Sequence, residues 1–237
     1  MNTPQIPMRR IVVVNIKGGC GKTTIATNLA SLYAAKGFGV SLFDYDPQGS
    51  SLQWLKQRPP SRPTVLGVAA HQAQSSVTRT FALRTPPNIT RVVVDTPAGL
   101  KGHRLAEQLK DNDVVIIPVV PSSIDIHATA DFMRDLLLVA KARTRRMRLA
   151  IVANRIKAAT PALQSFEVFL RGLNVPVVAR LRDTSDYLLA VEQGVGVHEM
   201  GQPDLPEAQQ DQNIWDEVFK WIETDSRPAS MPTSRVC

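Results

Sequence analysis

The sequence predicts an α/β fold in which a doubly wound, mostly parallel β-sheet is covered by helices on both faces. Short apolar runs rich in β-branched residues alternate along the chain with longer segments of helical spacing. The first of these runs is followed at once by a glycine-rich loop and then by a helical segment. In folds of this kind, ligands bind beyond the carboxyl ends of the strands, so the loops that follow the apolar runs are the segments of interest.

Six apolar runs are predicted as strands, because each is short, rich in valine and isoleucine, and bounded by turn or helical sequence. Near-continuous apolar runs are typical of parallel strands that are buried on both faces. In chain order these runs are Ile11–Val14, Val40–Phe43, Val92–Val94, Val114–Val120, Leu149–Ala153 and Val175–Val178.

Four segments between these runs have the length and apolar spacing of crossover helices, namely Thr23–Lys36, Gly102–Leu109, Ala128–Ala142 and Pro161–Leu173. A short strand and a helix are expected somewhere within 64–88. A last helix is predicted over 207–224, where Trp215, Val218 and Ile222 form an apolar stripe. We expect one domain over residues 1–225, and a disordered tail over 226–237 because that segment is short, polar and proline-containing.

Composition narrows the classes of function. Lysine and arginine number 28 against 21 acidic residues, giving a net charge of +7, which fits either a polyanionic partner or a well-solvated basic surface. The two cysteines, Cys20 and Cys237, exclude a disulfide framework and a C-x-x-C metal pair. No stretch of the sequence has the length of a signal peptide or a membrane-spanning helix, so we expect a cytoplasmic protein.

Residues 15–24 read NIKGGCGKTT and almost match the phosphate-binding pattern G-x-x-x-x-G-K-[ST]. The first glycine of that pattern would fall at Ile16, whereas a glycine pair stands at Gly18 and Gly19, preceded by a second lysine, Lys17. A loop that leaves a strand and opens a helix points backbone N–H groups at an anion. The loop is therefore predicted to bind phosphate.

Residue types within this loop suit a nucleotide. Lys22 is positioned to reach the β- and γ-phosphates, the Thr23 hydroxyl can ligate Mg²⁺, and Thr24 can donate a further hydrogen bond. Glycines allow the backbone to approach phosphate oxygens closely. The predicted nucleotide-binding residues of the loop are Lys17, Gly18, Gly19, Cys20, Gly21, Lys22, Thr23 and Thr24.

Two later strand ends carry carboxylates. The run ending at Phe43 is followed by Asp44 and Asp46, and the run ending at Val94 is followed by Asp95. A carboxylate at such a strand end next to a phosphate loop typically holds Mg²⁺ or its water shell. The Thr23 hydroxyl and these strand-end carboxylates are therefore the candidates for binding the metal or its water shell.

The segments KGGCGKTT, FDYDPQGS and VVVDTPAG closely resemble, in order, the deviant Walker A, Walker A′ and Walker B motifs of the ParA/MinD ATPases. A weaker resemblance continues to about Met200. It implies an ATP- and Mg²⁺-dependent ATPase that forms a homodimer around its nucleotides. In that family the extra lysine, here Lys17, reaches the phosphates of the other subunit, and Asp46 aligns with the residue that orients the attacking water. The same resemblance implies that Thr23 binds the metal, that Asp44 lies near the Mg²⁺ shell and that Asp95 is the Walker B acid, the two aspartates acting through water. Asn154 matches the asparagine that contacts adenine.

The resemblance also implies partners. ParA-like proteins bind DNA without sequence preference through lysines and arginines in the later part of the chain. In this sequence basic residues, Lys141 among them, gather in that part and predict a DNA-binding surface. The basic end of a solvated helix would have the same sequence pattern. We expect the pair at 180 and 182 to contribute more than the pair at 145 and 146. The predicted DNA-binding residues are Arg143, Arg145, Arg146, Arg148, Arg180 and Arg182.

The function implied is positioning of a cargo over the nucleoid, either a protein body such as a carboxysome or a plasmid or chromosome. A cargo-associated protein, which the sequence does not identify, would stimulate hydrolysis. Only residues 1–10 precede the first predicted strand, so no operator-binding helix-turn-helix domain is expected. The alternative is a MinD-like regulator of division-site or polar placement on the membrane, but the predicted last helix is acidic where a membrane-binding helix is basic. No membrane partner is expected.

Overall fold

The computed structural model describes residues 6–72, 85–141, 147–157, 161–201 and 206–224. These residues include seven strands that pair in parallel as one sheet, in the order β3-β2-β4-β1-β5-β6-β7. The predicted α/β fold with a parallel sheet is confirmed. The strands are β1 (Arg9–Val13), β2 (Val40–Asp44), β3 (Leu66–Ala69), β4 (Arg91–Asp95), β5 (Val114–Val119), β6 (Arg148–Ile156) and β7 (Val177–Arg182).

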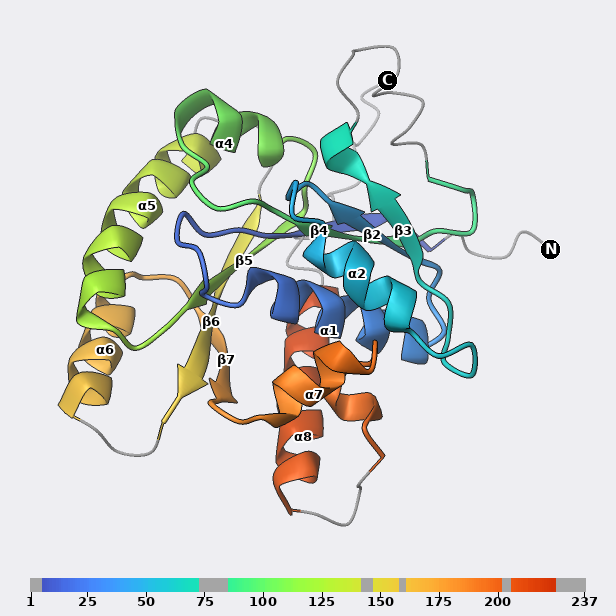
Figure 1. The fold of residues 1–237 in the computed structure, drawn as a ribbon. Coiled ribbons are helices and arrows are strands. Elements are labelled where there is room, and N and C mark those ends of the chain that lie inside the picture. The colour runs from blue at the N-terminus through green and yellow to red at the C-terminus, as the bar shows by residue number, and fades with distance from the viewer. Residues whose placement is uncertain (1–5, 73–84, 142–146, 158–160, 202–205, 225–237) are drawn as a thin grey trace, which may run out of the picture.

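Helices cover both faces of this sheet (Figure 1). One face carries α1 (Lys22–Ala35), α2 (Ser50–Gln57), α7 (Asp186–Glu192) and α8 (Pro206–Glu223), and the other carries α4 (Gly102–Gln108), α5 (Ser123–Lys141) and α6 (Pro161–Gly172). Two single 3₁₀ turns, η1 (Ala70–Gln72) and η2 (Val197–Glu199), complete the described elements.

Alternate residues of the strands belong to two separate hydrophobic cores, one on each face of the sheet. In β1, Ile11 and Val13 pack against α1 and α8, whereas Val12 packs on the side of α4 and α5. The same alternation continues in β5 and β6. A parallel strand of this kind is buried on both faces, which explains why its sequence reads as an uninterrupted apolar run.

Most predicted elements are found within a few residues of their expected bounds, but three points needed correction. The last strand was expected at Val175–Val178 and lies at 177–182, because Val175 is buried before the strand begins and the strand itself alternates buried and charged residues. Helix α5 begins at Ser123 rather than Ala128. Helices α2 and α7, each shorter than nine residues, were not predicted.

Helix α8 confirms the prediction for the last helix. Its apolar stripe of Trp215, Val218 and Ile222 is buried against the core on the α1 face, so this stripe is already covered within the chain. Within 64–88, the expected strand is β3, and most of the segment after it, with the predicted tail over 226–237, lies outside the described residues. None of the described helices is long and apolar enough to cross a membrane.

Candidate nucleotide site

The carboxyl ends of three neighbouring strands bring the predicted motifs together. Strand register pairs Asp95 of β4 with Val13 of β1 on one side and with Asp44 of β2 on the other. The loops that follow are joined directly, since Gly99 N–H donates to Ile16 O at 2.8 Å and Tyr45 N–H donates to Asp95 O at 3.0 Å. The three segments recognised in the sequence therefore form one site.

The loop between β1 and α1, residues 14–21 (the P-loop), has the backbone of an anion cradle. Gly19 and Gly21 adopt φ values of 74° and 94°, which favour glycine. The N-terminus of α1 has no side-chain cap and no acidic residue in its first turn. The first N–H groups of a helix lack partners within the helix, and together with the helix dipole they suit a phosphate.

The two lysines lie on this loop in different ways. Lys22 is buried and its Nζ donates to Lys17 O at 2.7 Å, so the ammonium group lies against the backbone of the P-loop, where the phosphates are predicted to bind. The backbone of Lys17 is held by Asn15, whose Oδ1 accepts from Lys17 N at 3.1 Å. Asn15 Nδ2 in turn donates to Pro118 O at 2.6 Å. The P-loop is thus anchored to β5 just ahead of the extra lysine.

Asn154, at the end of β6, braces the far side of the P-loop. Its Nδ2 donates to Cys20 O at 2.9 Å, and its Oδ1 accepts from Arg155 N at 3.0 Å. The contact is tight, because a Cβ on Gly21 would lie 2.1 Å from that same Nδ2. The structure therefore gives the buried Asn154 amide a loop-positioning role, while its contact with adenine stays a prediction.

Asp44 shapes the loop that follows β2. The side chain is fully buried, and its two carboxylate oxygens accept from Asp46 N at 3.0 Å and Leu52 N at 3.2 Å. The second contact places a negative charge on the first turn of α2, where the helix dipole favours it. Asp44 thus fixes the turn that presents Asp46.

Asp46 lies at the surface of this turn. Its Oδ1 accepts from Gln48 N at 3.0 Å, which is a local turn contact, and the side chain is only partly buried. The other carboxylate oxygen has no protein donor among the described residues. A carboxylate held by its neighbours yet open on one side has the arrangement needed to orient a water molecule.

Asp95 is the group whose surroundings best fit a metal ion. Its side chain is buried, and neither carboxylate oxygen has a partner in hydrogen-bond geometry within the described residues, although the Thr23 hydroxyl lies near enough to favour the ionised form. Burial is the main cause that raises the pKa of Asp95 from an ordinary 3.8 to about 7, and the Asp44 charge adds to it. A buried carboxylate without donors beside a hydroxyl suits a hydrated Mg²⁺.

Three of the six predicted DNA-binding arginines, Arg148, Arg180 and Arg182, lie within the described residues, and each contacts different partners. Arg143, Arg145 and Arg146 lie outside the described residues, as does the side chain of Lys141. Arg148 donates to the carbonyls of Trp221, Ile222 and Thr224 at the end of α8. This arginine therefore closes the C-terminus of α8, a structural role.

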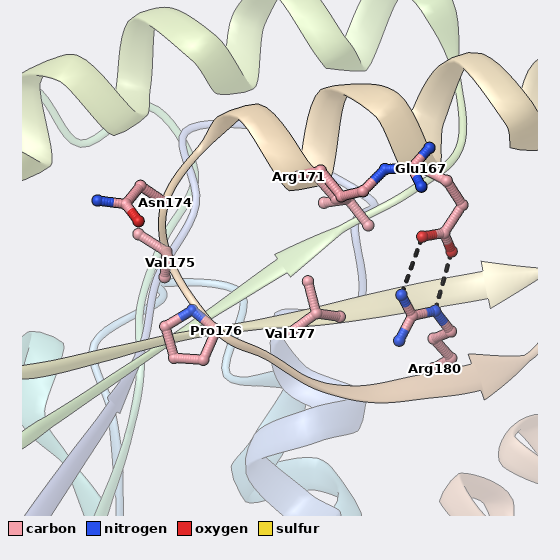
Figure 2. A pocket seen from close by; sticks show the side chains of 8 residues that line it. Glu167, Arg171, Asn174, Val175, Pro176, Val177 and Arg180 are labelled. Atoms are coloured by element: carbon pink, nitrogen blue, oxygen red, sulfur yellow. Dashed lines mark hydrogen bonds and ion pairs between the residues drawn. The ribbon is translucent and has the colours of Figure 1, made fainter.

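The arginines of β7 are engaged in ion pairs. Arg180 makes two hydrogen bonds of 2.9 Å to Glu167 of α6, as the dashed lines in Figure 2 show. Arg182 donates to Asp211 of α8 at 2.6 Å and lies 3.5 Å from Asp186. Asp211 is almost fully buried, so Arg182 neutralises a charge that would otherwise be isolated.

Two residues of the site were missed from the sequence. Asn15 anchors the P-loop, and Thr96 donates from Oγ1 to Val13 O at 2.8 Å, which ties the end of β4 to the start of that loop. Asn15 directly follows an apolar run and Thr96 comes one residue later, after Asp95, so both are polar residues at a strand end, the same signal that identified Asp44 and Asp95. That signal was available and was applied only to carboxylates.

Comparison with known proteins assigns the family. Residues 11–197 match the model of the CobQ/CobB/MinD/ParA nucleotide-binding domain. The chain is 29% identical over 214 residues, 88% of this chain and 95% of the relative, to maintenance of carboxysome distribution protein A of Halothiobacillus neapolitanus. Its fold resembles the ATP complex of McdA from Cyanothece, with a TM-score of 0.67, 16% identity and coverage of 90% and 96%.

The fold also resembles the MinC:MinD cell division complex of Aquifex aeolicus, with a TM-score of 0.68, 16% identity and coverage of 94% and 98% of the two chains. At these identities the solved structures bear on the fold alone. The family model, in contrast, extends over most of the sequence and includes the P-loop and both aspartate segments. The chain therefore belongs to the ParA/MinD family of nucleotide-binding ATPases.

Proposed function

We propose that this ATPase is a positioning protein: it dimerises with ATP, binds DNA without sequence preference, and distributes a cargo over the nucleoid. A cargo-associated protein stimulates hydrolysis and releases the dimer from DNA. The observation that carries the proposal is the similarity, over nearly the full length of both chains, to a protein named for carboxysome distribution. This similarity favours a protein body as the cargo over a plasmid or chromosome.

The site supports ATP with Mg²⁺ as the ligand. The glycines of the P-loop and the uncapped start of α1 suit the phosphates, and Lys22 would neutralise part of their charge. Thr23 and Asp95 would hold the metal ion, with Asp44 next to Asp95. Mg²⁺ would neutralise phosphate charge during transfer to water. Asp46 would orient that water, and Lys17 would act on the phosphates of the second subunit.

We propose fewer DNA-binding residues than the sequence suggested. Arg148 and Arg182 hold α8 in place, so we assign nucleoid contact to Arg143, Arg145 and Arg146, with Arg180 as an exposed addition. Contacts of this kind bind phosphates and carry no sequence information.

The membrane alternative has less support. Amphipathic anchors bind lipid through an unoccupied apolar face and a basic polar face. In α8 the apolar face is covered by the core. Its acidic residues Glu223 and Asp216 accept hydrogen bonds from Tyr33 of α1 and from Lys36, which directly follows α1. Vesicle binding is therefore the outcome that would favour the alternative.

One experiment tests the proposal as a whole. Light scattering should give a monomer with ADP and a dimer with ATP and Mg²⁺, and gel shifts with the same samples should retard two unrelated duplexes only with ATP. Flotation with anionic vesicles should leave the protein unbound. Lys17→Gln is the matched variant, since it should bind nucleotide and stay monomeric. A parent protein that floats with vesicles, or binds DNA equally with ADP, would overturn the proposal.

A further inference from the structure

A hollow of about 390 Å³ opens beside the P-loop, at the carboxyl edge of the sheet. Gly18 and Gly19 form one wall, and the ends of β5, β6 and β7, together with Leu163 of α6, form the rest. The residues that give it chemical character are Arg155, Lys157 and Asp183. None of the functional roles described so far uses these three side chains.

The end of β6 is deformed in a way that presents Arg155 to this hollow. The register between β6 and β7 shifts between Ala153 and Ile156, as in a bulge, and Arg155 has a φ of 54°. A left-handed backbone costs a non-glycine residue about 1–2 kcal/mol, and bulges beside active sites commonly redirect a side chain. The Arg155 N–H holds Asn154, so its backbone belongs to the P-loop brace while its side chain is exposed.

The charges of the hollow are incompletely matched within one chain. Lys157 and Asp183 are 3.4 Å apart, but their side chains are 73% and 34% exposed, so this pair is weak. Among the described residues, no carboxylate lies within ion-pair distance of the Arg155 guanidinium. The surface therefore carries two cations and one anion, all accessible to a partner.

We propose that Arg155 pairs with Asp183 of a second copy of this chain in the ATP-bound dimer. The proposal rests on the proposed function in one respect, which is that Lys17 crosses to the other subunit. Gly18 and Gly19 directly follow Lys17 and line the hollow, so a second copy that receives Lys17 must cover it. In a two-fold interface the same surface patch of both subunits comes together, so a patch that carries both positive and negative charges can pair with its own copy.

An arginine suits this role better than a lysine would. Its planar guanidinium can bind a carboxylate with two parallel hydrogen bonds, which adds geometric definition to the attraction. Each dimer would contain the pair twice, once on either side of the two-fold axis. The two pairs would flank the crossing lysines and fix the register in which Lys17 enters the opposite site.

Two variants that each reverse one charge test this pairing directly. Arg155→Glu alone places two acids together at both contacts of a homodimer, and Asp183→Arg alone places two arginines together. Each variant should dimerise at least about tenfold more weakly with ATP and Mg²⁺, because juxtaposed like charges oppose association. A mixture of the two variants restores opposite charges at both contacts, so it should dimerise close to the parent level.

The control is Arg171→Glu. Arg171 is also exposed, but it lies at the end of α6, in the hollow of Figure 2 where β7 begins, whereas Arg155 and Asp183 lie at the carboxyl ends of the strands. This variant carries the same change in charge and should dimerise like the parent. Nucleotide binding by each variant, measured by titration, reports whether the P-loop has kept its fold and should change less than about threefold.

The outcomes separate cleanly. Weak single variants with a dimerising mixture support the pairing. Single variants that dimerise normally, or a mixture that stays monomeric, overturn it, as does a loss of ATP binding in Arg155→Glu, which would place Arg155 on its own nucleotide. A parent that stays monomeric with ATP would instead overturn the proposed dimerising function, and this contact with it.

Discussion

Asn154 donates from its side-chain amide to the carbonyl oxygen of Cys20 at 2.9 Å, and so joins the end of β6 to the middle of the P-loop. The two residues are 134 positions apart in the chain. The same amide accepts from the Arg155 N–H, so both its donor end and its acceptor end make a hydrogen bond to the backbone. This contact makes the conformation of the phosphate loop depend on a distant strand.

Asn154→Ala should weaken ATP binding about tenfold and lower the melting temperature by several degrees. The substitution removes the hydrogen bonds that Asn154 makes to Cys20 O and to Arg155 N–H. Loss of the partner of a buried polar group costs about 1–3 kcal/mol. Titration with ATP and thermal denaturation measure the two effects.

Asn112→Ala is a suitable control for this prediction. Asn112 is also buried, but its Nδ2 donates to Gln108 O and Lys110 O, at the end of α4. This variant should lose stability and keep its affinity for ATP. Equal ATP affinity in Asn154→Ala and the parent would contradict the role given to the brace.

Asp46→Ala should leave ATP binding intact and reduce hydrolysis by at least about a hundredfold, because the lost carboxylate acts mainly in the transition state. The protein should accumulate as an ATP-bound dimer. Phosphate release and light scattering on one sample measure both properties.

Asp46→Asn separates chemistry from local structure. Asparagine keeps an oxygen that can accept from Gln48 N, so the turn is preserved while the negative charge is lost. Both variants should be inactive. If Asp46→Asn hydrolyses ATP normally, the residue serves the turn and not the water.

The pKa of Asp95 gives a pH-dependent prediction. Burial raises it to about 7, so the folded state favours the protonated carboxyl, and the stability that this provides is present at low pH and is lost as pH rises through 7. Asp95→Asn mimics the protonated form. Without nucleotide, the variant should match the parent near pH 4 and become more stable than it above pH 7, by roughly 2–4 kcal/mol.

Denaturant unfolding at several pH values measures this difference. With Mg·ATP bound, the parent should instead be the more stable protein. Mg·ATP needs the ionised carboxylate, so its binding should stabilise the parent but add little stability to Asp95→Asn. A difference between the two proteins that does not change with pH would contradict the assigned cause of the pKa shift.

The sequence was informative where the sheet is buried on both faces. The central strands are buried along their length and contain short apolar runs, so the carboxylates at the ends of β2 and β4 stand out, which is how Asp44 and Asp95 were found. The edge strand β7 alternates buried Ala179 and Leu181 with charged residues, so an apolar run placed it too early.

Long-range partners had no signal in the sequence. The ion pair of Arg182 with Asp211 joins β7 to α8 across 29 positions, and the Asn154 contact joins residues much farther apart. Nothing local distinguishes an arginine that binds DNA from one that holds a helix. The sequence therefore predicted a basic surface whose individual members the fold assigns to different tasks.

The last prediction concerns which arginines bind DNA, and it reverses the order expected from the sequence. Arg145→Glu combined with Arg146→Glu should weaken binding on unrelated duplexes alike, and each lost phosphate contact should lower the logarithmic salt slope by about 0.9. Arg180→Gln should have a smaller effect of the same kind, since Arg180 is about half exposed although paired with Glu167. Fluorescence anisotropy with ATP and Mg²⁺ over a range of salt concentrations measures these slopes.

Arg182→Gln should behave differently from the other variants. It removes the partner of buried Asp211, and breaking a buried ion pair from one side costs about 3–5 kcal/mol, so the variant should melt well below the parent. At a temperature where it remains folded, its salt slope should equal that of the parent, because no phosphate contact has been lost. If Arg182→Gln is instead as stable as the parent and its salt slope falls as in the 145 and 146 variant, Arg182 contacts DNA directly and its pairing with Asp211 is broken in the complex.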